Sequence, residues 1–178
     1  MTVSIDAFRA VMSRWVTGIT VITSRDGERT HGMVASSFCS VSADPPTVLF
    51  CADHRTRTFP LVQSSGVFAV NVLSAAQEDT FRVFAGWKEE HAEDKFAGEP
   101  TVAAVSGAPI LARALAWLDC RVAASYPGGN THTIFVGEVL GAGLGDGERE
   151  GDEGAPLVYS QRQVRRLAPG VEGVEEEA

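Results

Sequence analysis

Residues 17–27 read TGITVITSRDG, a run of mostly β-branched side chains that ends in a turn signal. Valine, isoleucine and threonine favour strands because their branched side chains fit a pleated, half-buried surface. The Asp-Gly pair at the end of the run is typical of the turn between two strands of a hairpin. We therefore expect a strand over residues 17–23 and a second strand over about residues 31–41.

The rest of the chain continues this pattern of short strands. Apolar runs predict further strands at residues 47–51, 67–72, 115–124, 131–140 and 156–159. Because the strands follow one another without regular helical crossovers, a doubly wound parallel sheet is disfavoured. The sequence instead predicts a mainly β protein with helices (α+β), in which a few helices decorate a β-barrel.

Two or three helices are predicted beside these strands. Residues 5–16 place apolar side chains at helical spacing behind Ser4, which predicts an amphipathic helix packed on the core. Residues 56–64 indicate a short helix or turn. Ser74 and Gln77 form the S-x-x-Q pattern of a capping box, which predicts the start of another helix.

The net charge of −8 over 178 residues is concentrated in two segments. Residues 141–155 carry a balance of −4 and residues 168–178 carry another −4, so the remaining chain is formally neutral. We expect a single domain over residues 1–167 and a disordered acidic tail over residues 168–178. The chain has no basic stripe of the kind that binds a phosphate backbone, which disfavours nucleic acid as a partner.

Neither membrane insertion nor secretion is expected. No apolar run approaches the ~20 residues that cross a bilayer. Charged residues interrupt residues 1–15, where a signal peptide would have its apolar core. The three cysteines form no C-x-x-C pair and cannot all pair with one another, which suits a reducing compartment. These features predict a cytoplasmic protein.

The common catalytic signatures are missing from the sequence. It contains no dinucleotide-binding G-x-G-x-x-G, no P-loop and no G-x-S-x-G nucleophile elbow. The four histidines show none of the H-x-x-x-H spacings of zinc sites. Cys39, Cys51 and His54 could be combined into a zinc site, but free cysteines in apolar strands usually act as small buried side chains. No metal site is therefore expected.

Two loops rich in hydroxyl groups are the remaining candidates for chemistry. Ser36 and Ser37 stand at the end of a predicted strand, and Thr56 and Thr58 flank Arg57 just after another strand. Hydroxyls, exposed backbone N–H groups and one arginine can together bind a phosphate without a glycine-rich loop. Serine and threonine are also ordinary turn residues, so the residues alone leave both interpretations open.

A series of short motifs extends from these loops along residues 6–167. It comprises TGITVIT at 17–23, GMVASSFCSVS at 32–42, DPP at 44–46, TRT at 56–58, FAVNVL at 68–73, HTIFVGEV at 132–139 and PLVY at 156–159. In this order the motifs resemble the flavin reductase family with the split β-barrel fold. Within that family, the chain looks like the small reductase component of two-component flavin-dependent monooxygenases.

The resemblance implies a flavin site in the two hydroxyl-rich loops and one strand end. Val34, Ala35, Ser36, Ser37 and Phe38 would line the flavin ring and its ribityl chain. Cys51 and Ala52 would pass under the ring, and Thr56, Arg57 and Thr58 would hold the phosphate. The resemblance thus favours the phosphate interpretation of the second loop.

The resemblance also implies a position for the nicotinamide. The family usually has Gly-Asp-His before the T-I-F strand, whereas this chain has Asn130, Thr131 and His132. The histidine is kept, and we expect His132 to act as the catalytic residue beside the nicotinamide. From the residues alone, His132 would be taken for a solvent-facing residue at a strand end.

The expected function is that of an NAD(P)H:flavin oxidoreductase. Such a protein reduces FAD or FMN by hydride transfer, with NADH as the expected donor, and supplies diffusing reduced flavin to a separate oxygenase. The resemblance further implies a homodimer. Two alternatives remain open: a flavin-binding carrier or sensor without turnover, and a split-barrel relative that binds another ligand such as haem. The sequence does not decide between FAD and FMN or between NADH and NADPH.

Overall fold

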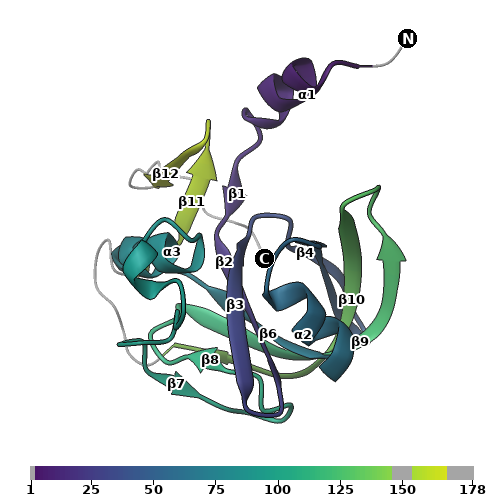
Figure 1. Ribbon diagram of the computed structural model, residues 1–178, viewed down its shortest axis with the longest axis vertical. Helices are drawn as coiled ribbons and strands as arrows, with labels where there is room; N and C mark the ends of the chain where they lie inside the picture. The colour runs from purple at the N-terminus through teal and green to yellow at the C-terminus, as the bar shows by residue number, and fades with distance from the viewer. Residues whose placement is uncertain (1–2, 146–153, 168–178) are drawn as a thin grey trace, which may run out of the picture.

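The computed structural model describes residues 3–145 and 154–167. The predicted acidic tail and most of the acidic loop at residues 141–155 therefore lie outside the described residues. The main element is a seven-stranded antiparallel sheet in the order β3-β2-β6-β9-β10-β5-β4 (Figure 1). Its strands are β2 (Thr20–Asp26), β3 (Arg29–Ala35), β4 (Cys39–Ala43), β5 (Pro46–Asp53), β6 (Val67–Val72), β9 (Ala116–Pro127) and β10 (His132–Leu144). The mainly β, α+β prediction is confirmed.

The two edge strands of this sheet are consecutive in the chain. Strand β3 ends at Ala35 and β4 begins at Cys39, at the opposite edge of the sheet. Only residues 36–38 join the two edges, so the sheet must curl until its edges approach each other, as in a barrel split along one seam. The single strand expected over residues 31–41 is wrong for the same reason: the chain crosses the seam in its middle.

Apolar side chains that alternate along the strands fill the inside of the curled sheet. Strand β5 points every second side chain inward, including the fully buried Phe50. The Phe50 ring lies 4.8 Å from that of Phe68 and 5.4 Å from that of Phe135, measured between ring centroids. Gly137 is needed in β10 because a Cβ there would overlap the Phe68 ring. This core fixes the β5–β10 pair that carries part of the candidate site.

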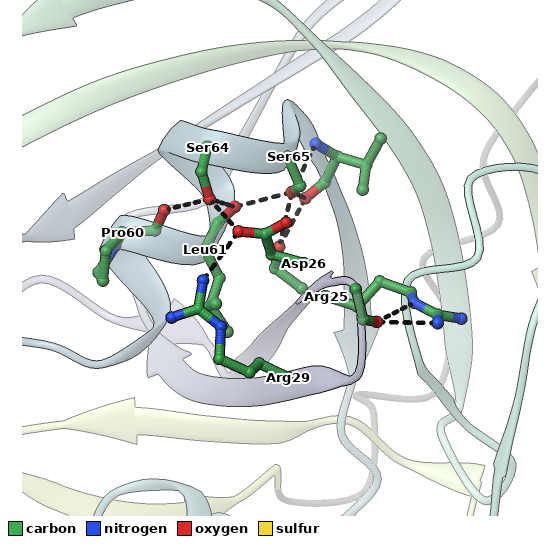
Figure 2. A network of polar contacts seen from close by, with 10 residues as sticks. Arg25, Asp26, Arg29, Pro60, Leu61, Ser64 and Ser65 are labelled. Atoms are coloured by element: carbon green, nitrogen blue, oxygen red, sulfur yellow. Dashed lines mark hydrogen bonds and ion pairs between the residues drawn. The ribbon is translucent and has the colours of Figure 1, made fainter.

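Helix α2 (Thr58–Ser65) packs against β2 and β3, and polar contacts anchor its C-terminal end to the turn between these strands. Figure 2 shows Asp26 between Ser64 and Arg29. The Ser64 hydroxyl donates to Asp26 Oδ2 at 2.8 Å, and Arg29 Nη2 donates to the same oxygen at 2.9 Å. These hydrogen bonds, the Ser64 bond first, hold the pKa of Asp26 below its ordinary value. The anchored helix in turn positions the 56–58 turn at its N-terminal end.

A second layer covers the opposite end of β2 and β3. It contains a three-stranded sheet of β1 (Thr17–Gly18), β11 (Leu157–Ser160) and β12 (Gln163–Arg166), together with η1 (Ala75–Gln77) and α3 (Glu78–Phe84). The capping box predicted at Ser74 and Gln77 is confirmed, because both of its hydrogen bonds form. Strand β12 was not predicted, since its short polar sequence carries no apolar alternation. The remaining elements are η2 (Glu89–His91), β7 (Thr101–Val102) and β8 (Ile110–Leu111).

Helix α1 (Ile5–Met12) forms as predicted, with the Ser4 hydroxyl accepting from the backbone N–H of Ala7. Its packing on the core was predicted wrongly, because no residue of α1 is buried. Ile5, Phe8 and Val11 are each at least 60% exposed. Figure 1 shows the helix standing away from the barrel at the end of the extended segment that contains β1. Helix α1 therefore presents an apolar face that the core formed by the described residues does not cover. None of the helices among the described residues is long and apolar enough to cross a membrane.

Candidate functional site

The three residues that cross the barrel seam form the first part of the site. Ser37 locks this crossing to β5, because its hydroxyl accepts from the backbone N–H of Cys51 at 3.1 Å and donates to the Cys51 carbonyl at 3.2 Å. The Phe38 ring packs against the barrel core. Ser36 is exposed and lines two cavities near the seam, each of about 560 Å³. The structure thus brings the predicted 36–38 and 51–52 segments together.

The small side chains beside the crossing form the floor of this region. Ala35 and Ala52 are buried, and Val34 and Cys51 are half-buried. Of these four, only Val34 lines the first of the two cavities described below. Ala35 and Ala52 can therefore shape the floor of a site, but their side chains offer little surface to a ligand.

The 56–58 turn forms the second part of the site, and the side chains of Thr56, Arg57 and Thr58 make different contacts there. Thr56 Oγ1 donates to the Asp53 carbonyl at 2.8 Å and accepts from the Phe59 N–H at 3.3 Å, so Thr56 fixes the start of α2. Thr58 is fully buried, and its hydroxyl lies 2.9 Å from Nδ1 of His31. Of the three, Arg57 alone has a side chain that is largely exposed, at 60%. Of these three side chains, Arg57 is therefore the one that can contact a charged group of a ligand directly.

A cavity of about 560 Å³ connects the two parts of the site. Val34, Ser36, Thr56 and Arg57, all predicted from the sequence, line it. Strand β3 and helix α3 form its walls, and they meet closely because β3 has a glycine at position 32. A Cβ at that position would lie 2.6 Å from the Phe84 ring. The predicted residues thus share one cavity with residues that the sequence did not single out.

The polar end of this cavity is cationic. Lys95 and Arg57 both line it, and its lining includes no carboxylate. Lys95 Nζ donates to the carbonyl oxygens of Phe84 at 2.9 Å and Gly32 at 3.3 Å, which ties α3 to β3. Burial, and then the neighbouring Arg57, lower the pKa of Lys95. Two cations in a lining without a carboxylate favour an anionic ligand such as a phosphate, which would compete with the exposed Glu93, 3.6 Å from Arg57 and outside the lining.

His31 lies at the same end of the cavity and is neutral near pH 7. Burial lowers its pKa to about 4, and the charges of Lys95 and Arg57 act in the same direction. With Nδ1 paired to Thr58, the buried Nε2 has no hydrogen-bond partner among the described residues. Sequence reasoning missed both His31 and Lys95, because each is a single polar residue in no recognisable spacing.

A second cavity of similar size lies between α1 and the β11–β12 hairpin. Phe8, Met12 and Trp15 line one wall, and Ser37 lies on another. Ser36 and Tyr159 line this cavity as well as the first one. The two cavities therefore meet at the seam and together form one elongated site.

His132 lies apart from both cavities. It is the first residue of β10 and pairs in register with Asp53, next to the Thr133–Ala52 pair. Its Nδ1 lies 2.9 Å from Thr131 Oγ1. Asp53 is held by Arg55, whose hydrogen bonds keep the pKa of Asp53 well below its usual range. His132 thus pairs with Asp53, the residue that follows the predicted Cys51–Ala52 floor in β5, and it does not line the main cavity.

The arrangement can hold an elongated anion beside apolar surface, but it contains no acid–base or nucleophilic constellation. The cavity offers cations at one end, hydroxyls at the seam and aromatic walls along α3. Within residues 3–145 and 154–167, no group of three or more His, Cys, Asp and Glu side chains comes together as metal ligands would. Such a site suits a bound molecule that carries its own reactivity.

Comparison with known proteins identifies the family of the chain. Residues 12–168 match the family described as the flavin reductase like domain. The chain is 38% identical over 162 residues to the reductase component of 4-hydroxyphenylacetate 3-monooxygenase from Thermus thermophilus, covering 91% of this chain and 96% of that protein.

Two solved structures extend the likeness to the fold. Nitrilotriacetate monooxygenase component B from Mycobacterium thermoresistibile superposes with a TM-score of 0.83 at 28% identity, covering 97% of this chain and 93% of the other. The NADH:FAD oxidoreductase SgcE6 of Streptomyces globisporus, in complex with NAD and FAD fragments, superposes with a TM-score of 0.81 at 36% identity, covering 94% of each chain. This protein therefore belongs to the family with the flavin reductase like domain.

Proposed function

We propose that this protein is an NADH-dependent flavin reductase that reduces FAD or FMN and supplies the reduced flavin to a separate monooxygenase. The observation that carries the proposal is the cavity at the barrel seam, where hydroxyls, aromatic walls and two cations surround one space. The T. thermophilus relative is named as the reductase component of such a monooxygenase. The SgcE6 structure is named as an NADH:FAD oxidoreductase.

The residues present fit a flavin nucleotide. A flavin is a flat ring joined to a chain that ends in a phosphate, and the site has apolar surface and a cationic end. The unpartnered Nε2 of His31 and the exposed guanidinium of Arg57 both suit a phosphate oxygen. When bound, the flavin would supply hydride-accepting chemistry, so the protein needs no nucleophile of its own.

Each predicted flavin residue then has a proposed task. Ser36 and Val34 contact the ring and its side chain, and Ser37 and Phe38 hold the crossing that carries them. Ala35, Cys51 and Ala52 form the floor under the ring. Arg57 binds the phosphate directly, Thr56 fixes the turn, and Thr58 orients His31. Two hydrogen bonds between Ser37 and Cys51 join the 34–38 and 51–52 segments.

His132 is proposed to contact the nicotinamide. In the β5–β10 register His132 lies next to the Thr133–Ala52 pair, beside the proposed floor under the ring, and it does not line the cavity proposed for the flavin phosphate. A nicotinamide stacked on the outer face of the flavin would approach from such an edge. His132 would bind the carboxamide or offset negative charge as the flavin is reduced.

We also propose that residues 1–167 form one reductase domain that works as a homodimer in the cytoplasm. The exposed apolar face of α1 supports a partner chain, since Ile5, Phe8 and Val11 would otherwise stay in water. A second copy seated on this face would also cover the α1 side of the second cavity. Sedimentation velocity of the wild type and of F8D tests this: the wild type should be a dimer, and F8D should shift toward the monomer.

Steady-state NADH oxidation tests the proposed activity. Purified protein should consume NADH when FAD or FMN is added, and much more slowly without added flavin. The same assay with NADPH measures the preference for the donor. Flavin binding without NADH consumption would favour a carrier or sensor. A haem-like absorption spectrum of the purified protein, without flavin binding, would favour the third alternative.

A further inference from the structure

The Arg57 guanidinium contacts a loop that lies 35 residues further along the chain. Its Nη1 donates to the carbonyl oxygen of Ala92 at 3.1 Å, and its Nη2 lies 3.6 Å from Oε1 of Glu93. Arg57 and Ala92 line the main cavity, whereas Glu93 does not. A ligand in the cavity thus meets a guanidinium that already lies beside a carboxylate of the protein.

Glu93 has no second partner to hold it. Its side chain is 91% exposed, and among the described residues Arg57 alone forms an ion pair or hydrogen bond with its carboxylate. The neighbouring Asp94, by contrast, turns the chain, because its Oδ1 accepts from the backbone N–H of Phe96 at 2.9 Å. Glu93 can therefore leave Arg57 without breaking any other polar contact, and an exposed ion pair of this kind contributes little to folding.

The loop is nevertheless anchored on both sides of Glu93. Before it, Lys88 Nζ lies 3.1 Å from Asp79 Oδ1 of α3. After it, Lys95 Nζ donates to carbonyl oxygens of α3 and β3. A carboxylate tethered in this way acts at a high effective concentration, so it returns to Arg57 whenever another anion leaves the guanidinium.

A ligand phosphate and Glu93 compete for the same positive charge. A phosphate that accepts a hydrogen bond from Arg57 brings a second anion close to the Glu93 carboxylate. Either the carboxylate then moves away and loses its ion pair, or the two anions stay close and repel each other. Both cases lower the affinity for a ligand that carries a phosphate. Because exposed ion pairs are weak, we expect the dissociation constant to be raised about threefold.

We propose that Glu93 limits how long the flavin stays bound: its carboxylate competes with the flavin phosphate for Arg57 and thereby promotes release of the reduced flavin. This proposal rests on the proposed function, in which Arg57 binds that phosphate and the reduced flavin leaves for a separate oxygenase. Such a reductase needs weak retention of its product, whereas a carrier needs tight retention. Glu93 is thus an affinity-determining residue that lies outside the lining of the cavity.

The test compares FMN with riboflavin, which has the same ring and ribityl chain but no phosphate. Dissociation constants are measured by fluorescence titration for the wild type, E93Q, the control E90Q, R57A and the double variant R57A/E93Q. Glu90 is an exposed acid of the same loop that forms no ion pair or hydrogen bond with Arg57.

E93Q should bind FMN about threefold more tightly than the wild type and bind riboflavin with unchanged affinity. E90Q should match the wild type with both ligands. In the R57A background, E93Q should have no effect, because the shared cation is gone. In anaerobic stopped flow, reduced FMN should leave E93Q about threefold more slowly than it leaves the wild type.

Several outcomes would overturn the proposal. An FMN affinity of E93Q within about 1.5-fold of the wild type would exclude competition. Equal tightening in E90Q or in the R57A background would mark a general effect of charge, and tighter riboflavin binding would show that the substitution changes the loop. Weaker FMN binding by E93Q would mean that Glu93 orients Arg57 for the phosphate. Failure of the proposed function is distinguishable, since the wild type would then bind FMN without oxidising NADH, whatever E93Q does to the affinity.

Discussion

Replacing Arg57 with alanine should weaken flavin binding without slowing hydride transfer once flavin is bound. The Arg57 guanidinium lines the cavity, and its other contacts are a bond to the Ala92 carbonyl and a 3.6 Å ion pair with the exposed Glu93. A hydrogen bond to a charged group contributes ~1.5–3 kcal/mol. Because the Arg57 side chain is 60% exposed, we take the lower end of that range. The expected loss of affinity is therefore roughly tenfold.

The assay is a fluorescence titration of FAD and of FMN with R57A, and Arg55→Ala serves as the matched control. Arg55 carries the same charge two residues away, but its Nε and Nη2 donate to Asp53, with Nη2 at 2.6 Å from Oδ2, and it does not line the cavity. R57A should lose affinity for both flavins alike, since both carry the phosphate next to the ribityl chain. The limiting rate of flavin reduction should stay near that of the wild type, which marks lost ground-state binding.

Two results would refute this reasoning. An R57A dissociation constant within twofold of the wild type would mean that Arg57 does not contact the phosphate. An equal loss in R55A would mean that the effect is a general change of charge near the mouth and not a specific contact. Raising the salt concentration separates these cases further, because a purely long-range attraction is screened strongly at 0.5 M salt whereas a direct contact is screened less.

Three further predictions follow from the site and the chain ends. His132→Ala should raise the KM for NADH or slow flavin reduction in stopped flow while flavin affinity stays unchanged; wild-type kinetics would leave His132 as a surface residue. Deleting residues 168–178, which are acidic and poor in apolar side chains, should leave turnover intact and the melting temperature within a few degrees; a larger drop would contradict this. Because of His31, the protein should become less stable as the pH falls from about 6.5 to about 4. Over this interval His31 takes up a proton in the unfolded chain but stays neutral in the folded chain, where its pKa is about 4. Since the His31 ring is only partly buried, we expect the free energy of unfolding to fall by ~1–2 kcal/mol. Urea unfolding at pH 7 and at pH 5 measures this change, which should be smaller in His31→Gln than in the wild type.

The strands could be read from the sequence because their signals are local. The 67–72 run became β6 with the predicted bounds, and the capping box at Ser74 formed as predicted. The packing of α1 could not be read in this way. An apolar stripe at helical spacing shows that one face avoids water, but it does not show which surface covers that face. Here no core within residues 3–145 and 154–167 does so, and the stripe at Phe8 stays exposed.

The residues of the candidate site likewise include some that the sequence predicted and some that it did not. Ser36, Thr56 and Arg57 stood in motifs and were predicted, and all three line the main cavity. His31 and Lys95 line it too, but each reaches it through contacts between segments distant in sequence. Lys95 lies there because Nζ bridges carbonyls of β3 and the end of α3. A contact of this kind leaves no spacing pattern in the chain, so it can be found only in the folded protein.

The split in the barrel explains why a protein without catalytic side-chain groupings can still be a specific enzyme. At the seam the chain must cross from one sheet edge to the other, and residues 36–38 have no partner strand on their way. The exposed Ser36 hydroxyl, which lines both cavities, is therefore available to a ligand, while the Ser37–Cys51 bonds hold the crossing to β5. On one side of the crossing lies the cationic cavity, and on the other lies the cavity under the apolar helix α1. Such a seam can bind and orient two nucleotides, and orientation is what a hydride transfer between two cofactors requires of the protein.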